Sequence, residues 1–276
     1  MLNDYISDKV LGFYEKLPFN CSSSPDIAAS EIKNTNMLTY YFRGYEALFS
    51  EEKSVLEIGC GTGWMSNMIT YYHGAKVVGV DFNPKAISFA KETNSLLGGD
   101  TTFIVSDLFD YESDAFDIVV SIGVLHHTKD CIGGIKKACG LTKQSGHVII
   151  GLYNLFGRRP FLNHFDKLKS EGYSEEQLFD EYRKLDKRHR DETLAKSWFY
   201  DQVLHPHETL HTLEEVINTF DASNVKIAAT SINNYNEFES IKDLMKLETQ
   251  LYDKGMAFLE NQKYYSGLFI VIGQAC

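Results

Sequence analysis

The sequence lacks the features of a secreted, disulfide-bonded or membrane-spanning protein. Its five cysteines are odd in number, form no CxxC pair and are too sparse for a disulfide scaffold, so we expect reduced thiols. No stretch approaches the roughly 20 apolar residues that a membrane-spanning helix needs. The first residues are partly acidic where a signal peptide has a basic region followed by an apolar run. The cytoplasm is therefore the expected location, with no membrane partner.

Basic residues are also scarce. The 27 Lys and Arg residues stand against 38 Asp and Glu residues, which gives a formal net charge of -11. Tight nonspecific binding to nucleic acid or to an anionic membrane needs a basic face. We therefore expect no nucleic-acid partner, and a small or neutral substrate is favoured. The oligomeric state does not follow from the sequence.

What the sequence does contain is an alternation of short apolar runs and helical patterns from Ser54 to about Tyr153. This alternation is typical of βαβ units and a parallel sheet. The apolar residues are consecutive, as expected for strands that helices cover on both faces. The predicted strands are residues 54–59, 76–81, 101–106, 116–121 and 147–152, followed by 224–230 and 264–273. The predicted helices of the core are residues 64–73, 84–97 and 131–142.

The remaining segments are predicted to be additions to this core. We expect a helical amino-terminal cap segment at residues 1–50, the core at 51–152, a helical insertion at 153–211, and the end of the core at 212–276 with a helical insertion at about 236–262. Ligands of an open parallel sheet bind outside the carboxyl ends of the strands, and the insertion leaves from that edge. It should therefore roof a pocket. Arg158, Arg159 and Lys167 within it could meet an anionic acceptor group, but mixed-charge helices of this kind are usually solvated surface. The residues 40–43 are a candidate for closing over the ligand or for ordinary core packing.

The strongest motif is VLEIGCGTG, which places Gly59, Gly61 and Gly63 between a strand and a helix. Glycine there lets the chain turn sharply and approach a ligand at the amino end of the helix. Such a turn also serves dinucleotides, phosphates or turn geometry alone. Two carboxylates narrow the choice of ligand to one that contains adenosine. Asp81 ends the second strand, where Rossmann-like folds hold a ribose diol, and Asp107 follows the third strand, within reach of an adenine amino group.

With FDIVVSIGVLHHT after the fourth strand, these residues make the segment 54–153 resemble the class I S-adenosylmethionine-dependent methyltransferases, nearest the ubiquinone/menaquinone-type small-molecule enzymes. The resemblance implies an α/β fold with a Rossmann-like sheet, mostly parallel with an antiparallel last strand, under a helical cap. It implies S-adenosyl-L-methionine as the cofactor and S-adenosyl-L-homocysteine as the product. The GxGxG spacing supports this cofactor over NAD, because dinucleotide folds usually need GxGxxG for the pyrophosphate.

The resemblance also implies individual cofactor contacts. Glu57 and residues 59–63 would lie along the methionine moiety and the ribose, Asp81 would bind the ribose hydroxyls, and Phe82 would flank the adenine. Glu57 could instead be a buried acid that backbone donors satisfy. The full expected set is Glu57, Gly59, Cys60, Gly61, Thr62, Gly63, Asp81, Phe82, Ser106, Asp107, Leu108, Ser121 and Gly123.

The loop after the fourth strand would face the reactive methyl group. Methyl transfer from a sulfonium is an in-line displacement, so alignment of the nucleophile matters most. If the acceptor is a hydroxyl, His126 or His127 could take its proton, because histidine titrates near neutrality. The alternative is that both histidines only shape the loop.

The insertion contains a second motif, WFYDQVLHPHETLHT, at residues 198–212. His207, Glu208 and His211 match HExxH, which in zinc proteases places two histidines on one helical face. Thr212 and Glu215 form a capping box, however, so a helix would begin after His211 and the histidines would not share a face. We therefore expect no metal and regard His207 and Glu208 as candidate catalytic contacts to the acceptor. The other expected substrate contacts are Trp198, Tyr200, Asp201, Gln202, His205 and His211.

These observations together predict a methyltransferase that acts on an oxygen or nitrogen atom of a small molecule. Sugar or natural-product tailoring is the first expectation within that class. Two alternatives remain: a methyltransferase that modifies a protein or RNA, and a protein that binds S-adenosylmethionine without turnover.

Overall fold

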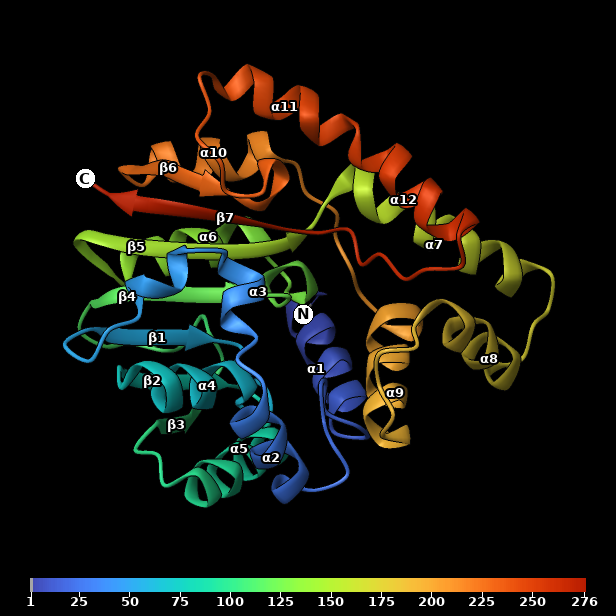
Figure 1. Cartoon of the computed structure of the whole chain (residues 1–276), viewed down its shortest axis with the longest axis horizontal. Coiled ribbons are helices and arrows are strands. Elements are labelled where there is room, and N and C mark those ends of the chain that lie inside the picture. Colours follow the sequence, from blue (N-terminus) through green and yellow to red (C-terminus); the bar gives the residue numbers. More distant parts are fainter. Residues whose placement is uncertain (1) are drawn as a thin grey trace.

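The core of the chain is a seven-stranded sheet, in a computed structural model that describes residues 2–276 and the side chains of residues 6–276 (Figure 1). The parallel strands are β1 (Ser54–Ile58), β2 (Lys76–Asp81), β3 (Thr102–Val105), β4 (Phe116–Ile122) and β5 (Thr142–Tyr153). Their order is β3-β2-β1-β4-β5, followed by β7 (Leu268–Ala275) and β6 (Val225–Thr230). Strand β7 is antiparallel to both of its neighbours. This arrangement confirms the expected fold class, including the antiparallel last strand.

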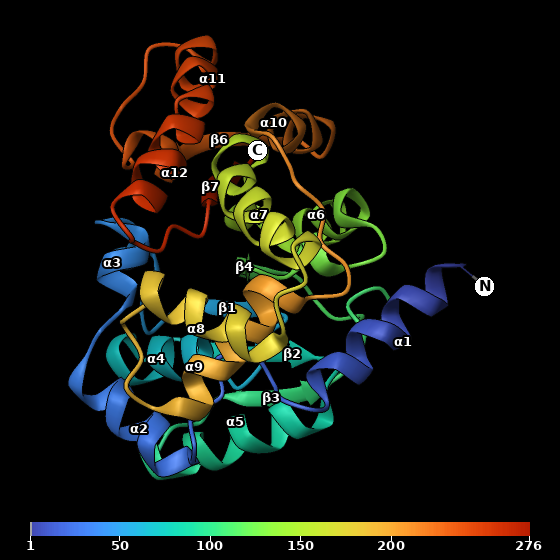
Figure 2. The ribbon, with the colours of Figure 1, turned by 90° about the vertical axis from the view of Figure 1, so that its right-hand side faces the viewer.

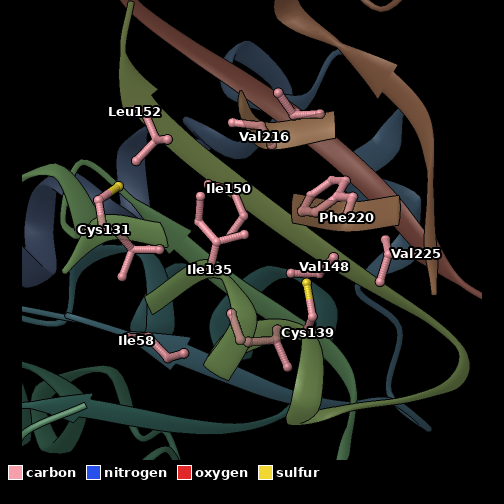
Figure 3. Packing of buried hydrophobic residues seen from close by; sticks show 14 of the residues in the cluster. Ile58, Cys131, Ile135, Cys139, Val148, Ile150, Leu152, Val216, Phe220 and Val225 are labelled. Carbon is pink, nitrogen blue, oxygen red and sulfur yellow. The ribbon is translucent and has the colours of Figure 1, made fainter. Parts of the chain in front are cut away.

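Helices cover both faces of the sheet because successive residues of a strand point to opposite sides. Leu56 and Ile150 belong to an apolar cluster on the face covered by α6 (Cys131–Gly140) and α10 (Leu213–Ala222). Figure 3 shows Ile150 beside Ile135 of α6, with Phe220 of α10 nearby. Val55 and Ile149 belong to a second cluster, with residues of α2 (Pro25–Asn34), α3 (Leu38–Phe42) and α4 (Trp64–His73). Helix α5 (Pro84–Leu97) packs on α2 and α4.

The starts of two helices follow from local capping chemistry. The Asn83 side chain accepts hydrogen bonds from the backbone N–H groups of Lys85 and Ala86, and Pro84 occupies the first turn of α5, where no N–H is needed. Thr212 and Glu215 form the predicted capping box at the start of α10. Helix α10 therefore begins directly after the HExxH segment, as expected.

A group of helices lies beyond the carboxyl ends of the parallel strands (Figures 1 and 2). These helices are α1 (Leu2–Tyr14), α7 (Leu155–Ser170), α8 (Glu175–Leu185) and α9 (Glu192–Phe199), with a π-helical turn η3 (Tyr200–Leu204) after α9. Phe161, Tyr182 and Phe199 are central members of an apolar cluster that joins α7, α8 and α9. Helices α11 (Ile241–Thr249) and α12 (Leu251–Glu260) pack against α7. Single 3-10 turns are η1 (Tyr45–Leu48), η2 (Leu125–His127) and η4 (Ser231–Asn233).

The predicted elements are present, with differences at their ends. Strand β7 begins at Leu268 instead of residue 264, because Gly267 has a left-handed φ of +70° and Tyr264 belongs to the cap, where its N–H donates to the Leu185 carbonyl. Strand β5 begins at Thr142, ahead of the predicted residue 147, with an irregularity in its pairing to β4. Helix α6 consequently ends at Gly140. Among the described residues, no helix is both long and apolar enough to cross a membrane.

Candidate active site

A cavity lies at the carboxyl ends of the parallel strands. Its wall comes from the segments that follow β1, β2, β3 and β4, and from α1 with the residues after it. Its empty space, with the open mouth included, is about 910 Å³. The wall is mostly apolar, with Val10, Phe19 and Leu108 among its members. None of the described wall residues is Lys or Arg.

The glycine-rich turn forms the floor beside β1. The backbone N–H groups of Gly59 and Cys60 donate to the Val80 carbonyl, which ties the turn to the end of β2. Gly59 and Gly61 have positive φ values of 73° and 51°, which side chains other than glycine rarely adopt. A Cβ on Gly59 would meet Val124 at 2.4 Å, whereas a Cβ on Gly61 would meet nothing within 4 Å. The turn therefore presents bare backbone to the cavity at Gly61.

Asp81 lies at the end of β2 and on the cavity wall. Its Oδ2 accepts a hydrogen bond from the Gly61 N–H at 2.9 Å, and its Oδ1 accepts one from the Asn83 N–H at 2.8 Å. Burial raises the pKa of the carboxyl to about 6, although these two hydrogen bonds act in the opposite direction. Each carboxylate oxygen keeps a further lone pair, so the group can still accept hydrogen bonds from a diol.

The adenine side of the expected site also reaches the cavity. Phe82, Ser106, Asp107 and Leu108 all contribute to its wall, as does Gly123 after β4. The Asp107 Oδ1 accepts a hydrogen bond from the Phe109 N–H at 2.7 Å, which fixes the carboxylate at the start of its loop. Eight of the expected cofactor contacts are thus on the wall: Gly59, Gly61, Asp81, Phe82, Ser106, Asp107, Leu108 and Gly123.

The structure places the other expected cofactor contacts, Glu57, Cys60, Thr62, Gly63 and Ser121, behind this wall. Glu57 is buried and accepts a hydrogen bond from the Ser66 hydroxyl, and burial raises the pKa of its carboxyl to about 8. The Ser121 hydroxyl donates to the Ile58 carbonyl, and the Thr62 hydroxyl donates to the Asn20 carbonyl. The buried-acid alternative for Glu57 is therefore favoured, with a side-chain hydroxyl as the donor.

The two histidines after β4 have different environments. His127 belongs to the cavity wall, and its Nδ1 lies 2.8 Å from the His207 carbonyl oxygen. A carbonyl only accepts, so the His127 Nδ1 carries a proton and donates it to this contact. His126 is fully buried, and its Nδ1 accepts the Tyr153 N–H. Burial lowers the pKa of His126 well below its usual range, so it stays neutral behind the wall.

The HExxH segment is an extended strap, which we define as residues 205–211. The Thr209 N–H and hydroxyl donate to the His126 carbonyl, and the His207 Nε2 lies 3.2 Å from the Thr128 carbonyl oxygen. His211 forms an isolated bridge with Asn154 at the end of β5. His207, Glu208 and His211 are therefore not brought to the cavity wall as acceptor contacts. His207 holds the strap against the loop that carries His127, and His211 holds it against the end of β5.

Glu208 pairs with a buried arginine. The Arg158 Nε and Nη2 donate to the two Glu208 carboxylate oxygens at 3.0 and 2.9 Å. Arg158 is fully buried, with its guanidinium 4.1 Å from the centre of the Tyr153 ring. Its Nη1 and Nη2 also donate to the side chain and the carbonyl of Gln202. The expectation that Arg158 lies on a solvated surface was therefore wrong, because Glu208 and Gln202 satisfy its charge inside the cap.

Asp201 is the centre of a buried polar network behind the cavity. Its Oδ1 accepts the Tyr14 hydroxyl at 2.5 Å, and its Oδ2 accepts the Gln202 amide at 2.7 Å. The Tyr153 hydroxyl lies 3.3 Å from the same Oδ2. Burial raises the pKa of the Asp201 carboxyl. His205 stacks on His127 with ring centres 3.7 Å apart, and burial lowers its pKa.

The two aromatic members of the expected substrate set lie farther out. The Trp198 indole N–H donates to Asn20, and its ring packs on Phe19, a residue of the cavity wall. The Tyr200 hydroxyl donates to Glu175. Trp198 therefore supports the wall from behind, while Tyr200 joins η3 to α8.

The sequence predicted an amino-terminal cap but not which of its residues reach the cavity. Val10 and Tyr14 of α1 and Phe19 after it lie on the cavity wall. By contrast, Phe42 packs in the core and Tyr40 is 65% exposed, so residues 40–43 do not close the cavity. The amphipathic pattern of α1 was the available signal, but amphipathicity does not reveal which surface a helix covers.

Comparison with known proteins gives a consistent assignment. The family model described as a methyltransferase domain matches residues 49–266. A Methanocaldococcus jannaschii protein named as a protein N5-glutamine methyltransferase is 41% identical over 70 residues, which are 25% of this chain and 36% of that protein. A ubiquinone biosynthesis O-methyltransferase of Vibrio atlanticus is 29% identical over 124 residues, 44% of this chain and 51% of that protein. The chain thus spans about half or less of the length of these curated relatives.

The solved structure of magnesium protoporphyrin IX methyltransferase from Synechocystis PCC 6803, with bound S-adenosylhomocysteine, has the same fold. The TM-score is 0.53 at 14% sequence identity, and the match covers 89% of this chain and 83% of that one. The similarity therefore extends over the cap as well as the sheet.

Proposed function

Because the chain belongs to the methyltransferase-domain family, with S-adenosylmethionine as its cofactor, we propose that it transfers a methyl group to an oxygen or nitrogen atom of a small molecule. A sugar or a natural product is the first acceptor class to test. The observation that carries the proposal is one cavity that joins the bare backbone at Gly61, the carboxylates of Asp81 and Asp107, and the imidazole of His127. The expected location is the cytoplasm.

The residues of the cavity fit the cofactor. Asp81 would accept the ribose hydroxyls, Asp107 would accept the adenine amino group, and the open face of Gly61 would lie along the methionine moiety. Bound there, S-adenosylmethionine supplies a methyl group that its sulfonium already activates. The wall residues then have to exclude water and align the acceptor atom with that methyl group.

The chemistry of the wall favours an acceptor that is largely apolar and carries no phosphate, which places a natural product ahead of a simple sugar. Its apolar side chains come from α1 and from the loops after β1, β3 and β4, and no Lys or Arg is present among the described wall residues. Phosphate groups are usually held by Arg, Lys or a helix amino end. The relative named as a protein N5-glutamine methyltransferase keeps a protein acceptor as the alternative. The expectation of no nucleic-acid partner rests on the net charge alone.

The deciding experiment incubates the protein with cell extract and a methyl donor labelled on its methyl group. Products are separated into small molecules, proteins and nucleic acids. We expect the label among small molecules. Label in protein or RNA would contradict the proposed acceptor class, and no transfer despite donor binding would leave a binding protein without turnover.

We expect the affinity for S-adenosylmethionine to depend on the ionisation of Asp81. The ionised carboxylate accepts both ribose hydroxyls, and the pKa of this group in the free protein is raised to about 6. Affinity should therefore be full above pH 7 and fall about tenfold by pH 5, as the carboxyl is protonated. Calorimetry between pH 5 and pH 7.5 measures this affinity.

The controls for this prediction are Asp81→Asn and Glu57→Gln. Asp81→Asn should weaken binding about tenfold at pH 7.5, since it removes a charge-assisted hydrogen bond, and should abolish the pH dependence. Glu57→Gln should keep the pH dependence, because the raised pKa of about 8 leaves Glu57 protonated throughout. A parent affinity that does not change between pH 7 and pH 5 would exclude Asp81 as the ribose carboxylate.

A further inference from the structure

Three side chains, two buried and one half-buried, meet at and behind the cavity wall. His127 comes from the turn after β4, Asp201 from the π-helical turn η3, and His205 from the start of the strap. One ligand atom from each lies within 4.8 Å of the other two. The distance between the His127 Nε2 and the Asp201 Oδ1 is 3.9 Å. Two imidazoles and a carboxylate thus lie together, although His127 is some 75 residues from the other two in the chain.

The orientation of His127 leaves a buried nitrogen atom without a partner. Its Nδ1 donates to the His207 carbonyl, and its Nε2 lies on the side of the Asp201 carboxyl group. The Nε2 is buried and has no hydrogen-bond partner within the described protein. A buried polar atom without a partner is unfavourable, and the Nε2 of His205 is buried without a partner as well. A cation bound by these nitrogen atoms and the carboxyl group would supply the missing partner.

Asp201 is held as a metal-bound carboxylate usually is. Tyr14 donates to its Oδ1, and Gln202 donates to its Oδ2, so the carboxylate is fixed while Oδ1 keeps a further lone pair. Outer hydrogen bonds of this kind orient the ligands of protein metal sites, as does the carbonyl that fixes the Nδ1 proton of a ligating histidine. The nearby Arg158 does not oppose a cation fully, since Glu208 pairs with its guanidinium.

We propose that His127, Asp201 and His205 bind a divalent transition-metal ion, with Zn²⁺ or a metal of similar coordination preference as the resident ion. Two histidines and one carboxylate are a ligand set of catalytic zinc and non-haem iron sites, and they leave at least one coordination position open. His127 belongs to the cavity wall, so the ion would lie beside the cavity. Resting on the proposed function, this site would bind the acceptor's oxygen or nitrogen atom.

Metal binding would break one hydrogen bond of His205. The His207 N–H donates to the His205 Nδ1 at 3.1 Å, so the ring proton of the metal-free protein is on Nε2. Coordination through Nε2 moves this proton to Nδ1 and breaks that hydrogen bond. We therefore expect an affinity in the micromolar range, weaker than that of structural zinc sites. The proposal replaces our expectation that no metal is bound, which considered only the HExxH histidines.

The test titrates Co²⁺ and Zn²⁺ into the full-length protein after treatment with a chelator. We expect one Co²⁺ per chain, with visible absorption bands of a nitrogen- and oxygen-coordinated ion that Zn²⁺ displaces. His127→Gln, Asp201→Asn and His205→Gln should each weaken binding at least tenfold. His147→Gln on β5 and His211→Gln in the HExxH motif should bind like the parent.

Several outcomes would overturn the proposal. The first is that the parent shows no saturable Co²⁺ binding, and the second is that the three ligand variants bind Co²⁺ as tightly as the parent. The third is that only His211→Gln loses Co²⁺ binding, which would assign the ion to the HExxH motif. Thermal melts identify any variant that fails to fold. The spectrum of the parent protein tests the proposal even if all variants fail to fold. Donor binding and methyl transfer are measured separately, so an absence of transfer would contradict the proposed function while the metal titration still decides the site.

Discussion

Replacing His127 with glutamine is expected to slow methyl transfer about a hundredfold, the scale of losing one group that deprotonates or positions the acceptor. The affinity for S-adenosylmethionine should stay within about threefold of the parent value, because the described contacts of His127 are with the strap and with Asp201 rather than with Asp81 or the glycine-rich turn. Glutamine keeps a donor for the His207 carbonyl but removes the imidazole Nε2. Steady-state rates at saturating donor and calorimetry of donor binding measure the two effects separately.

His147→Gln is the matched control for this prediction. It makes the same chemical change at a half-buried histidine of β5 that lies outside the cavity wall, so both activity and donor affinity should be unchanged. If His127→Gln transfers methyl groups as fast as the parent, the acceptor does not use this imidazole. If donor affinity falls in step with the rate, His127 acts on the cofactor instead.

The central sheet could be predicted because its signals are local. Apolar runs of four to seven residues, the Asn83-Pro84 helix start and the Thr212–Glu215 capping box each lie within a few residues of the element that they specify. The cofactor side of the cavity could be predicted for the same reason. Gly61, Asp81 and Asp107 follow directly on predicted strands, and parallel strands bring their carboxyl ends to one edge.

The acceptor side of the cavity could not be predicted from the sequence, because its contacts join segments that are far apart in the chain. Nothing in the HExxH motif indicates that the carbonyl of His207 fixes the ring proton of His127, or that Tyr14 donates to Asp201. Adjacent histidines at 126 and 127 look alike in the sequence. Only the packing of the strap on the loop after β4 places one on the cavity wall and the other behind it.

The burial of Arg158 could not be predicted from the sequence either. In a stretch of mixed charge and no strong apolar periodicity, an arginine is usually solvated. Here its helix starts at the end of β5, and three segments meet around the guanidinium: α7, the end of η3 and the strap. A Cβ on Gly267 would meet the backbone N of Arg158 at 2.4 Å, so the glycine before β7 lets that fourth segment approach.

Replacing Arg158 with alanine is expected to lower the free energy of unfolding by about 3–5 kcal/mol, the range for removing one partner of a buried ion pair. The change leaves the Glu208 carboxylate and the Gln202 carbonyl without their donor inside the cap, and it opens a cavity beside Tyr153. Urea unfolding measures the loss. The exposed pair of Lys226 and Asp221 supplies the control, since Lys226→Ala should cost less than about 1 kcal/mol.

Combining Arg158→Met with Glu208→Gln should recover part of this loss, because the double variant has no unpaired buried charge. An Arg158→Ala variant as stable as Lys226→Ala would mean that backbone hydrogen bonds alone hold the strap, among them those from Thr209 to His126. Arg158 is not on the cavity wall, so any effect of the double variant on methyl transfer must act through the strap. The expected sign is a slower rate with unchanged donor affinity, since a loosened strap no longer holds the His207 carbonyl that fixes the ring proton of His127.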